Sequence, residues 1–187
     1  MTFRSNERLA TDRHASPRWR VLAWLVHCQQ GTTAVEFGLL ALPFFAVLFA
    51  ILETGLFFVA QEELQSATTA AARLIMTGQA QNQGLTASTF QQQVCANAVA
   101  LFTCSGIYVN VQNFSSFSGM SMLNPLQNGN FNSASLNYNV GGPGDIELIQ
   151  VFYQWPVITG LLGFNLSNMN GNNRLLVATA VFRNEPY

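Results

Sequence analysis

The sequence contains no lysine and few charged residues of any kind, since charged side chains make up 9% of its 187 residues. Globular domains typically have about 25% charged residues, so neither an ordinary cytosolic enzyme nor a charged disordered tail fits. All eight basic residues are arginine, and five of them lie in the first 20 residues. Because the rest of the chain has no basic patch to neutralise phosphates, nucleic-acid binding is not expected.

Histidine is almost as scarce, because His14 and His27 are the only two and both precede residue 31. Without lysine, the remainder of the chain cannot assemble a serine–histidine, cysteine–histidine or lysine-based nucleophilic site. Asp145 and Glu147 would share one face of a strand, but two carboxylates without a third ligand make a weak metal site. The sequence therefore predicts a protein that is not an enzyme, with no catalytic residue, no metal site and no cofactor.

One long apolar run dominates the first third of the chain. Residues 37–52 contain no charged or amide side chain, and the wider apolar tract covers residues 34–60. As helices these segments would be about 24 Å and about 40 Å long, against a bilayer hydrocarbon core of roughly 30 Å. Large apolar side chains point all round the helix: Phe44, Phe45, Leu48, Phe49, Ile51 and Leu52. This pattern favours a single membrane span over the alternative, a buried helix of a soluble protein.

The arginines and cysteines indicate how the span is oriented. Residues 1–31 carry five arginines and two acids, whereas the next arginine after the span is Arg73. Positive residues stay on the cytoplasmic side, so we expect a cytoplasmic N-terminus and a periplasmic C-terminal part. That compartment permits a disulfide between Cys95 and Cys104, with two free thiols as the alternative. A bond requires the helix that holds Cys95 to break before Cys104, because nine helical residues rise about 13.5 Å.

A short motif stands immediately before the apolar run. Gly31 and Thr32 are followed by Glu36 and Phe37, so an acid lies five residues after the glycine, at the edge of the hydrocarbon. Glycine allows the chain to extend into a protease cleft, whereas a carboxylate at a span has a cost unless it finds a partner. An α-amino group released by cleavage after Gly31, with a pKa near 7.7 to 8, would be such a partner on a neighbouring copy.

This motif resembles the type III prepilin signal, and residues 31–78 are similar to TadE-like proteins. The similar features are the Ala34–Phe37 stretch, Pro43 in the span, a second acid at Glu53 and the alanine-rich segment before Gly78. Residues 178–187 also resemble the closing strand and tail of that family. TadE-like proteins are pseudopilins, or minor pilins, of the tight-adherence (Tad) pilus machinery.

The resemblance implies specific roles for the motif. Gly31 would be the last leader residue, Thr32 the new amino terminus, and Glu36 a recognition or assembly acid, with Phe37 next to it. The implied partners are an inner-membrane prepilin peptidase, other pilins and pilus assembly proteins, and the lipid bilayer. The implied location is the inner membrane, or an extracellular pilus after processing, with a role in pilus assembly and surface adherence. The alternative is an uncleaved single-pass anchor that displays an asparagine-rich periplasmic binding domain.

The predicted fold is α+β and pilin-like. It comprises a cytoplasmic leader (1–31), a transmembrane and spine helix (32–78) and a periplasmic head domain (79–187). The spine helix is expected over residues 34–77 and to stop at Gly78. After a polar turn at residues 79–84, a second helix capped by Thr86 or Ser88 is expected, followed by loops over residues 115–144 and 163–173.

Apolar residues at helical spacing should face the core from the second helix: Phe90, Val94, Ala98, Leu101 and Phe102. Period-two alternation predicts antiparallel strands over residues 107–112, 146–153 and 175–182, with a fourth over 136–140 as a further candidate.

Overall fold

The computed structural model describes residues 31–98, 101–158 and 165–187. Most of the predicted leader, residues 1–30, lies outside the described residues. The chain forms two compact units, Met1–Phe45 and Ala46–Tyr187. In the first unit the described residues are Gly31 and the initial turns of helix α2, and the second unit contains the rest of α2 and an α+β domain. The predicted α+β class, with one long N-terminal helix and a small antiparallel sheet, is confirmed.

Helix α2 is Thr32–Met76 and contains 45 residues, close to the predicted 34–77. It ends where the sequence predicts, because Gly78 adopts a left-handed conformation with φ of 74°. The Thr77 N–H donates to the Arg73 carbonyl and the Gly78 N–H to the Ile75 carbonyl, which satisfies the last turn. A Cβ at Gly78 would also collide with the ring of Tyr187, so the C-terminal residue packs against this glycine. Glycine at position 78 is therefore required both by the backbone conformation and by the close approach of the tail.

Two shorter helices follow, α3 (Gln79–Asn82) and α4 (Ala87–Asn97). The predicted polar turn is thus partly helical. Thr86 caps α4 as expected, since its side chain accepts from the Thr89 N–H and the Thr89 side chain reciprocates. Phe90 and Val94 are fully buried. The helix ends at Asn97, so Leu101 and Phe102 join the core from outside it, contrary to the predicted helical stripe.

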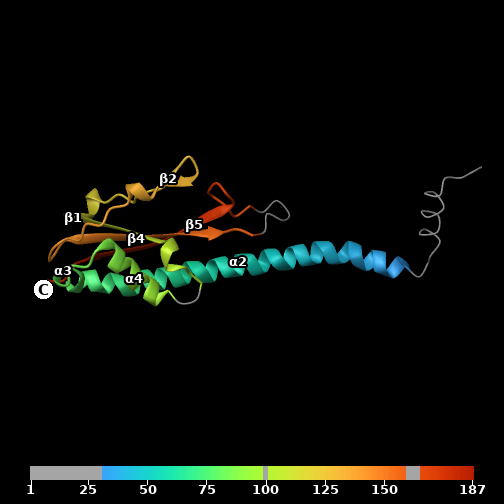
Figure 1. Ribbon diagram of the computed structural model, residues 1–187, viewed down its shortest axis with the longest axis horizontal. Coiled ribbons are helices and arrows are strands. Elements are labelled where there is room, and N and C mark those ends of the chain that lie inside the picture. The colour runs from blue at the N-terminus through green and yellow to red at the C-terminus, as the bar shows by residue number, and fades with distance from the viewer. Residues whose placement is uncertain (1–30, 99–100, 159–164) are drawn as a thin grey trace, which may run out of the picture. The chain divides into compact units, whose positions relative to one another are not determined.

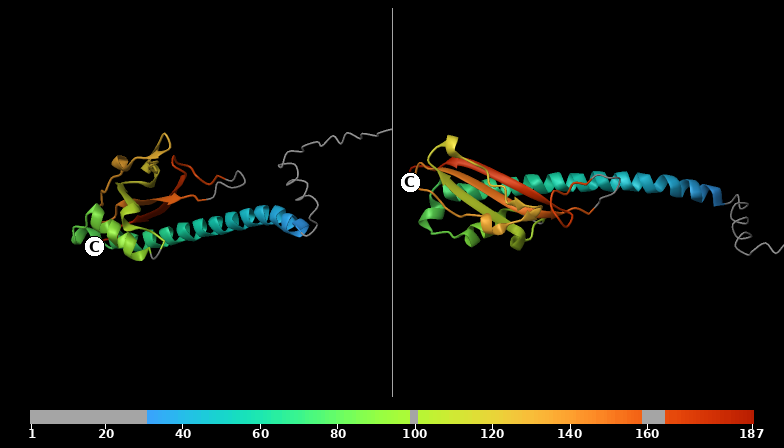
Figure 2. Two further views of the ribbon diagram at one scale, coloured as in Figure 1. Left: turned by 45° about the vertical axis from the view of Figure 1, so that its right-hand side comes forward. Right: turned by 90° about the horizontal axis from the view of Figure 1, so that it is seen from above.

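The main sheet has three antiparallel strands, β1 (Ile107–Phe114), β4 (Ile146–Pro156) and β5 (Asn173–Arg183), in the order β1-β4-β5. Figure 2 shows these strands side by side. All three predicted strands are therefore present, and each extends beyond the predicted segment of alternating residues. The register pairs Val109 with Val151 and Val151 with Ala178.

The candidate fourth strand is not formed, because residues 136–140 contribute only an isolated parallel bridge between Tyr138 and Val111. The preceding loop instead contains a small hairpin, β2 (Leu126–Gln127) and β3 (Asn130–Phe131). Asn128 and Gly129 take positive φ in its two-residue turn, which is the residue pair that such turns favour. Short 3₁₀ turns lie at Cys104–Gly106, Phe117–Gly119 and Ser133–Ser135.

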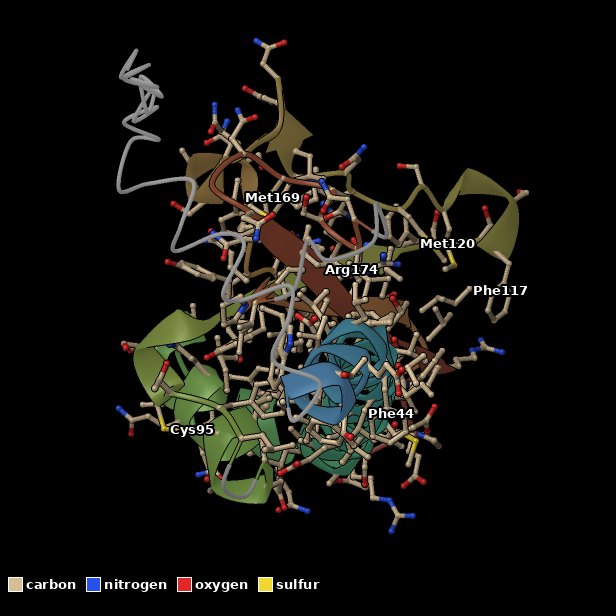
Figure 3. The ribbon with its side chains drawn as sticks, turned by 90° about the vertical axis from the view of Figure 1, so that its right-hand side faces the viewer. Phe44, Cys95, Phe117, Met120, Met169 and Arg174 are labelled. Atoms are coloured by element: carbon tan, nitrogen blue, oxygen red, sulfur yellow. A yellow bond between two sulfur atoms is a disulfide. The ribbon has the colours of Figure 1, made fainter. Side chains whose placement is uncertain are left out.

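Each face of the sheet packs against a different part of the chain. In Figure 1, β4 and β5 run beside the second half of α2, and the main hydrophobic cluster joins α2, α4 and one sheet face. Its fully buried members include Leu64, Phe90, Ile149 and Leu176. The opposite face is covered mainly by the loop between β1 and β4, and Phe152 of β4 is buried on this face. Met169, from the segment before β5, joins the same cluster (Figure 3). The sheet is therefore sandwiched between the helices and a long loop.

Candidate functional site

The most unusual surface of the described chain is the apolar part of α2. Fifteen large apolar side chains between Val35 and Val59 are 37% to 73% exposed. Completing their burial would contribute about 1 kcal/mol for each side chain, or on the order of 15 kcal/mol together. That sum is as large as the net stability of a typical domain. Helix α2 is long and apolar enough to cross a membrane, and 6% of its most apolar window is buried within the chain.

The residues of the predicted processing motif lie at the start of this helix. Gly31 immediately precedes α2, and Thr32 is the first residue of α2. Gly31, Thr32 and Glu36 are exposed, and Phe37 is 69% exposed. A Cβ added at Gly31 would meet no described atom within 4 Å, so the fold itself does not require glycine there. The geometry leaves the Gly31–Thr32 bond at the exposed start of the helix.

Two glutamines join α2 to the free edge of the sheet. Strand β5 pairs with β4 on one side. On its other side, Gln61 Nε2 donates to the Val177 carbonyl at 2.9 Å. Gln65 Nε2 donates to the Thr179 carbonyl at 2.9 Å, and the Thr179 N–H donates to Gln65 Oε1 at 3.1 Å. These bonds satisfy backbone groups that would otherwise be open to pairing with another chain. The periodicity of apolar residues did not reveal this role, because it gives no signal for a polar side chain whose partner lies more than 100 residues away in the chain.

A disulfide closes the turn after α4. Cys95 and Cys104 are bonded, with their Cα atoms 5.4 Å apart. The condition derived from the sequence is met, since α4 ends at Asn97 and the chain returns to place Cys104 in a 3₁₀ turn. Gln91 Nε2 also donates to the Cys104 carbonyl at 2.7 Å. The bond therefore fixes the connection between α4 and β1, and Cys95, labelled in Figure 3, is partly buried against the main hydrophobic cluster.

A buried carboxyl group lies where the C-terminal tail meets the sheet. Glu147 is completely buried, and its Oε1 accepts from the Gly141 N–H and from Asn184 Nδ2. Burial raises the pKa of Glu147 to about 7, although these two donors oppose the change. Its Oε2 lacks a partner within the described chain, as do the buried atoms Tyr138 Oη, Asn184 Oδ1 and Gln81 Oε1. Desolvation, together with the nearby Glu147, raises the pKa of Tyr138 to about 12.

The neighbouring Asp145 has a different setting. It is partly exposed, and its carboxylate accepts from the Gly142 N–H at 2.8 Å. Both carboxylates therefore accept hydrogen bonds from the glycine-rich turn before β4. The sequence predicted this turn only as the end of a loop. In residues 31–98, 101–158 and 165–187, no group of three or more histidine, cysteine, aspartate or glutamate side chains could hold a metal ion.

The other end of the sheet contacts the apolar helix. The Ile158 N–H, just after β4, donates to Glu53 Oε1 at 2.6 Å. The Arg174 guanidinium, at the start of β5, lies 4.7 Å from the centre of the Phe57 ring. Figure 3 shows Arg174 between the sheet and α2. This end of the domain therefore packs directly beside the apolar tract of α2.

Within the described residues the fold is α+β with one helix long and apolar enough to cross a membrane, which is compatible with a single-pass membrane protein. Comparison with protein-family models adds a specific family: residues 31–73 match the model of the TadE-like protein. The match begins at Gly31 and covers most of α2, so the family resemblance of the sequence is confirmed over this segment. It indicates a protein associated with the Tad pilus. Comparisons with curated proteins and with solved structures gave no match.

Proposed function

We propose that this protein is a non-catalytic pseudopilin or minor pilin of a Tad-type pilus, processed between Gly31 and Thr32. The observation that carries the proposal is a helix that begins directly after the glycine of the motif and exposes its large apolar side chains from Val35 to Val59. The TadE-like match covers most of this helix. A surface of this kind must be covered by lipid or by other helices, and a pilin uses both in turn.

The proposed mechanism is an exchange of lipid contacts for contacts with other helices. The apolar tract is stored in the bilayer until assembly, when the same side chains pack against the helices of other subunits. Burial in either environment is favourable, so transfer does not expose the tract to water. Glu36 at the start of α2 would pair with the amino group of a neighbouring Thr32 after cleavage. This pair would offset the cost of holding a carboxylate beside hydrocarbon.

Two independent features support a periplasmic location for the C-terminal domain. The arginine-rich N-terminus favours a cytoplasmic start, and the Cys95–Cys104 disulfide favours an oxidising compartment after the span. A fusion of alkaline phosphatase to Tyr187 tests this orientation. We expect an active enzyme, because alkaline phosphatase folds only where disulfides form. An inactive fusion at normal expression would reverse the proposed orientation.

The decisive test of processing is the mass of the mature chain. We expect the purified protein to begin at Thr32, which would make it 31 residues shorter than the full sequence. Replacing Gly31 by isoleucine should leave the intact chain in the membrane. Gly38→Ile is the matched control, because a Cβ at Gly38 also meets no described atom within 4 Å. Normal processing of Gly31→Ile would refute the cleavage assignment, and an intact wild-type chain would favour the uncleaved anchor.

Glu36→Gln separates the two roles proposed for this acid. If the carboxylate is needed for recognition by the prepilin peptidase, the unprocessed chain accumulates. If it is needed for assembly, the mature chain accumulates in the membrane and pili are lost from the surface. Normal processing together with normal piliation would exclude both roles.

A further inference from the structure

The contact between Glu53 and the residue just after β4 fixes the position of the domain along the axis of α2. The last of the exposed large apolar side chains on α2 is Val59, six residues after Glu53. Six helical residues rise about 9 Å. Because the Ile158 N–H is bonded to Glu53, the turn after β4 overlaps the apolar tract by about this length. This end of the domain therefore lies beside apolar helix rather than beyond it.

The length of this overlap is close to the length by which the apolar tract exceeds the thickness of the hydrocarbon core. The exposed apolar side chains run from Val35 to Val59, a helical length of about 37 Å. The hydrocarbon core is roughly 30 Å thick, which leaves about 7 Å of apolar helix outside it. The overlapping segment thus falls at the depth of the lipid headgroups when the tract spans the membrane.

The side chains at this end have the composition of a membrane interface. Phe102, Tyr153 and Trp155 form an aromatic cluster, with ring centres 4.8 to 6.4 Å apart. All three are partly exposed, and Ile158 is 83% exposed. Tryptophan and tyrosine are enriched at headgroup depth, where an apolar ring and a polar atom can both be accommodated. Arg174, stacked on Phe57, adds a positive charge of the kind that anionic headgroups attract.

We propose that this end of the domain, formed by Trp155, Ile158 and Arg174 next to Glu53 and Phe57, is a membrane seat that binds the outer surface of the phospholipid bilayer. The occupant is lipid because the seat is continuous with the apolar tract of α2. The seat rests on the proposed function, since it requires α2 to span the membrane. It holds the domain against the bilayer before assembly, and extraction of α2 must break this contact.

Tryptophan fluorescence provides a direct test. After residue 31 the sequence contains a single tryptophan, Trp155, which lies in the seat. The probe is the full chain carrying Trp19→Phe and Trp24→Phe, reconstituted into vesicles of phosphatidylcholine and phosphatidylglycerol. Some vesicles contain lipids brominated either near the headgroup or deep in the acyl chain. We expect loss of Trp155 fluorescence with the shallow bromine and a smaller loss with the deep one.

A second probe supplies the control. Phe117→Trp, combined with Trp19→Phe, Trp24→Phe and Trp155→Phe, places the only tryptophan at a side chain that is 63% exposed. Residue 117 follows the end of β1 that pairs with Ile146, at the opposite end of the sheet from Trp155. We expect no fluorescence loss for this probe. Equal loss at both positions would overturn the seat, because the domain would then contact lipid without a preferred end.

Flotation of the same vesicles separates failure of the seat from failure of the proposed function. If the protein floats with the vesicles and Trp155 is not quenched, α2 is inserted but the seat is wrong, and another copy of the chain becomes the better occupant. If the protein does not float, the span itself is refuted. Ile158→Glu should float normally and reduce the quenching of Trp155, whereas Ile158→Leu should retain it.

Discussion

Glu147 makes the stability of this protein depend on pH. The side chain is fully buried, and burial raises its pKa from an ordinary 4.5 to about 7. Folding therefore favours the protonated acid. Below about pH 4.5 the group is neutral in both the folded and the unfolded chain. Between about 4.5 and 7 only the unfolded chain loses the proton, so the free energy of unfolding falls as pH rises.

The size of the effect follows from that interval. About 1.4 kcal/mol for each pH unit over the interval from 4.5 to about 7 gives about 3 kcal/mol. The loss is complete above about pH 7, where both states are ionised. Because the buried Oε2 lacks a partner within the described chain, ionisation would leave part of the charge without a hydrogen bond.

Glu147→Gln tests this reasoning, because a glutamine amide keeps the shape and the donor of the neutral acid without ionising. Urea unfolding of the full chain in detergent, followed by circular dichroism at pH 5 and pH 8, gives the free energies. We expect the wild type to lose about 2.5 kcal/mol between these pH values, since a small part of the loss already occurs below pH 5, and the variant to lose much less. Glu185→Gln, which removes an exposed carboxylate, is the matched control and should retain the wild-type loss. Parallel pH dependence of the wild type and Glu147→Gln would refute the assignment.

Three further predictions concern the packing of the domain. Replacing both cysteines of the disulfide by alanine should lower the free energy of unfolding by about 2.5 kcal/mol, measured by urea unfolding with and without reductant; reductant should then have no effect on the variant. Leu64→Ala, at a fully buried position, should cost about 2 to 5 kcal/mol by thermal unfolding, whereas Leu56→Ala, which is 54% exposed, should cost far less, and equal costs would contradict the observed core. Gln65→Leu should cost about 1 to 3 kcal/mol and speed hydrogen exchange at the Thr179 amide, since both of its hydrogen bonds to β5 are lost; unchanged exchange would show that this edge is protected in another way.

Local patterns were sufficient for the regular elements. Period-two alternation predicted β1, β4 and β5, because successive side chains of a strand point to opposite faces of the sheet. The long apolar run predicted α2, because a helix that is apolar all round has a continuous apolar sequence. Gly78 was identifiable as a helix stop because few other residues adopt a left-handed conformation without strain. The motif from Gly31 to Phe37 needed no structure at all, and its chemical roles stay predictions.

The sequence was less informative where pairing depends on distant segments. The helix at α4 was expected to continue to Phe102, but it ends at Asn97 and the chain returns so that Cys95 meets Cys104. On α2 the fold buries Ala60 while its neighbour Val59 remains 56% exposed, a difference that the all-round apolar pattern of the sequence does not predict. Thr68 is fully buried although it is polar, because its hydroxyl donates to the Leu64 carbonyl within the same helix.

Residue order alone predicted a helix long and apolar enough to cross a membrane, a glycine at its start, and a small domain after it whose strands alternate apolar and polar residues. The tertiary structure decided which polar groups are removed from water. It placed Gln61 and Gln65 on the free edge of β5, and it buried Glu147 beneath the C-terminal tail. It also brought Ile158 to Glu53, more than 100 residues away in the chain. Hydrophobic burial depends on the local pattern of side chains, whereas a hydrogen bond requires two particular atoms to meet, and only the folded chain brings them together.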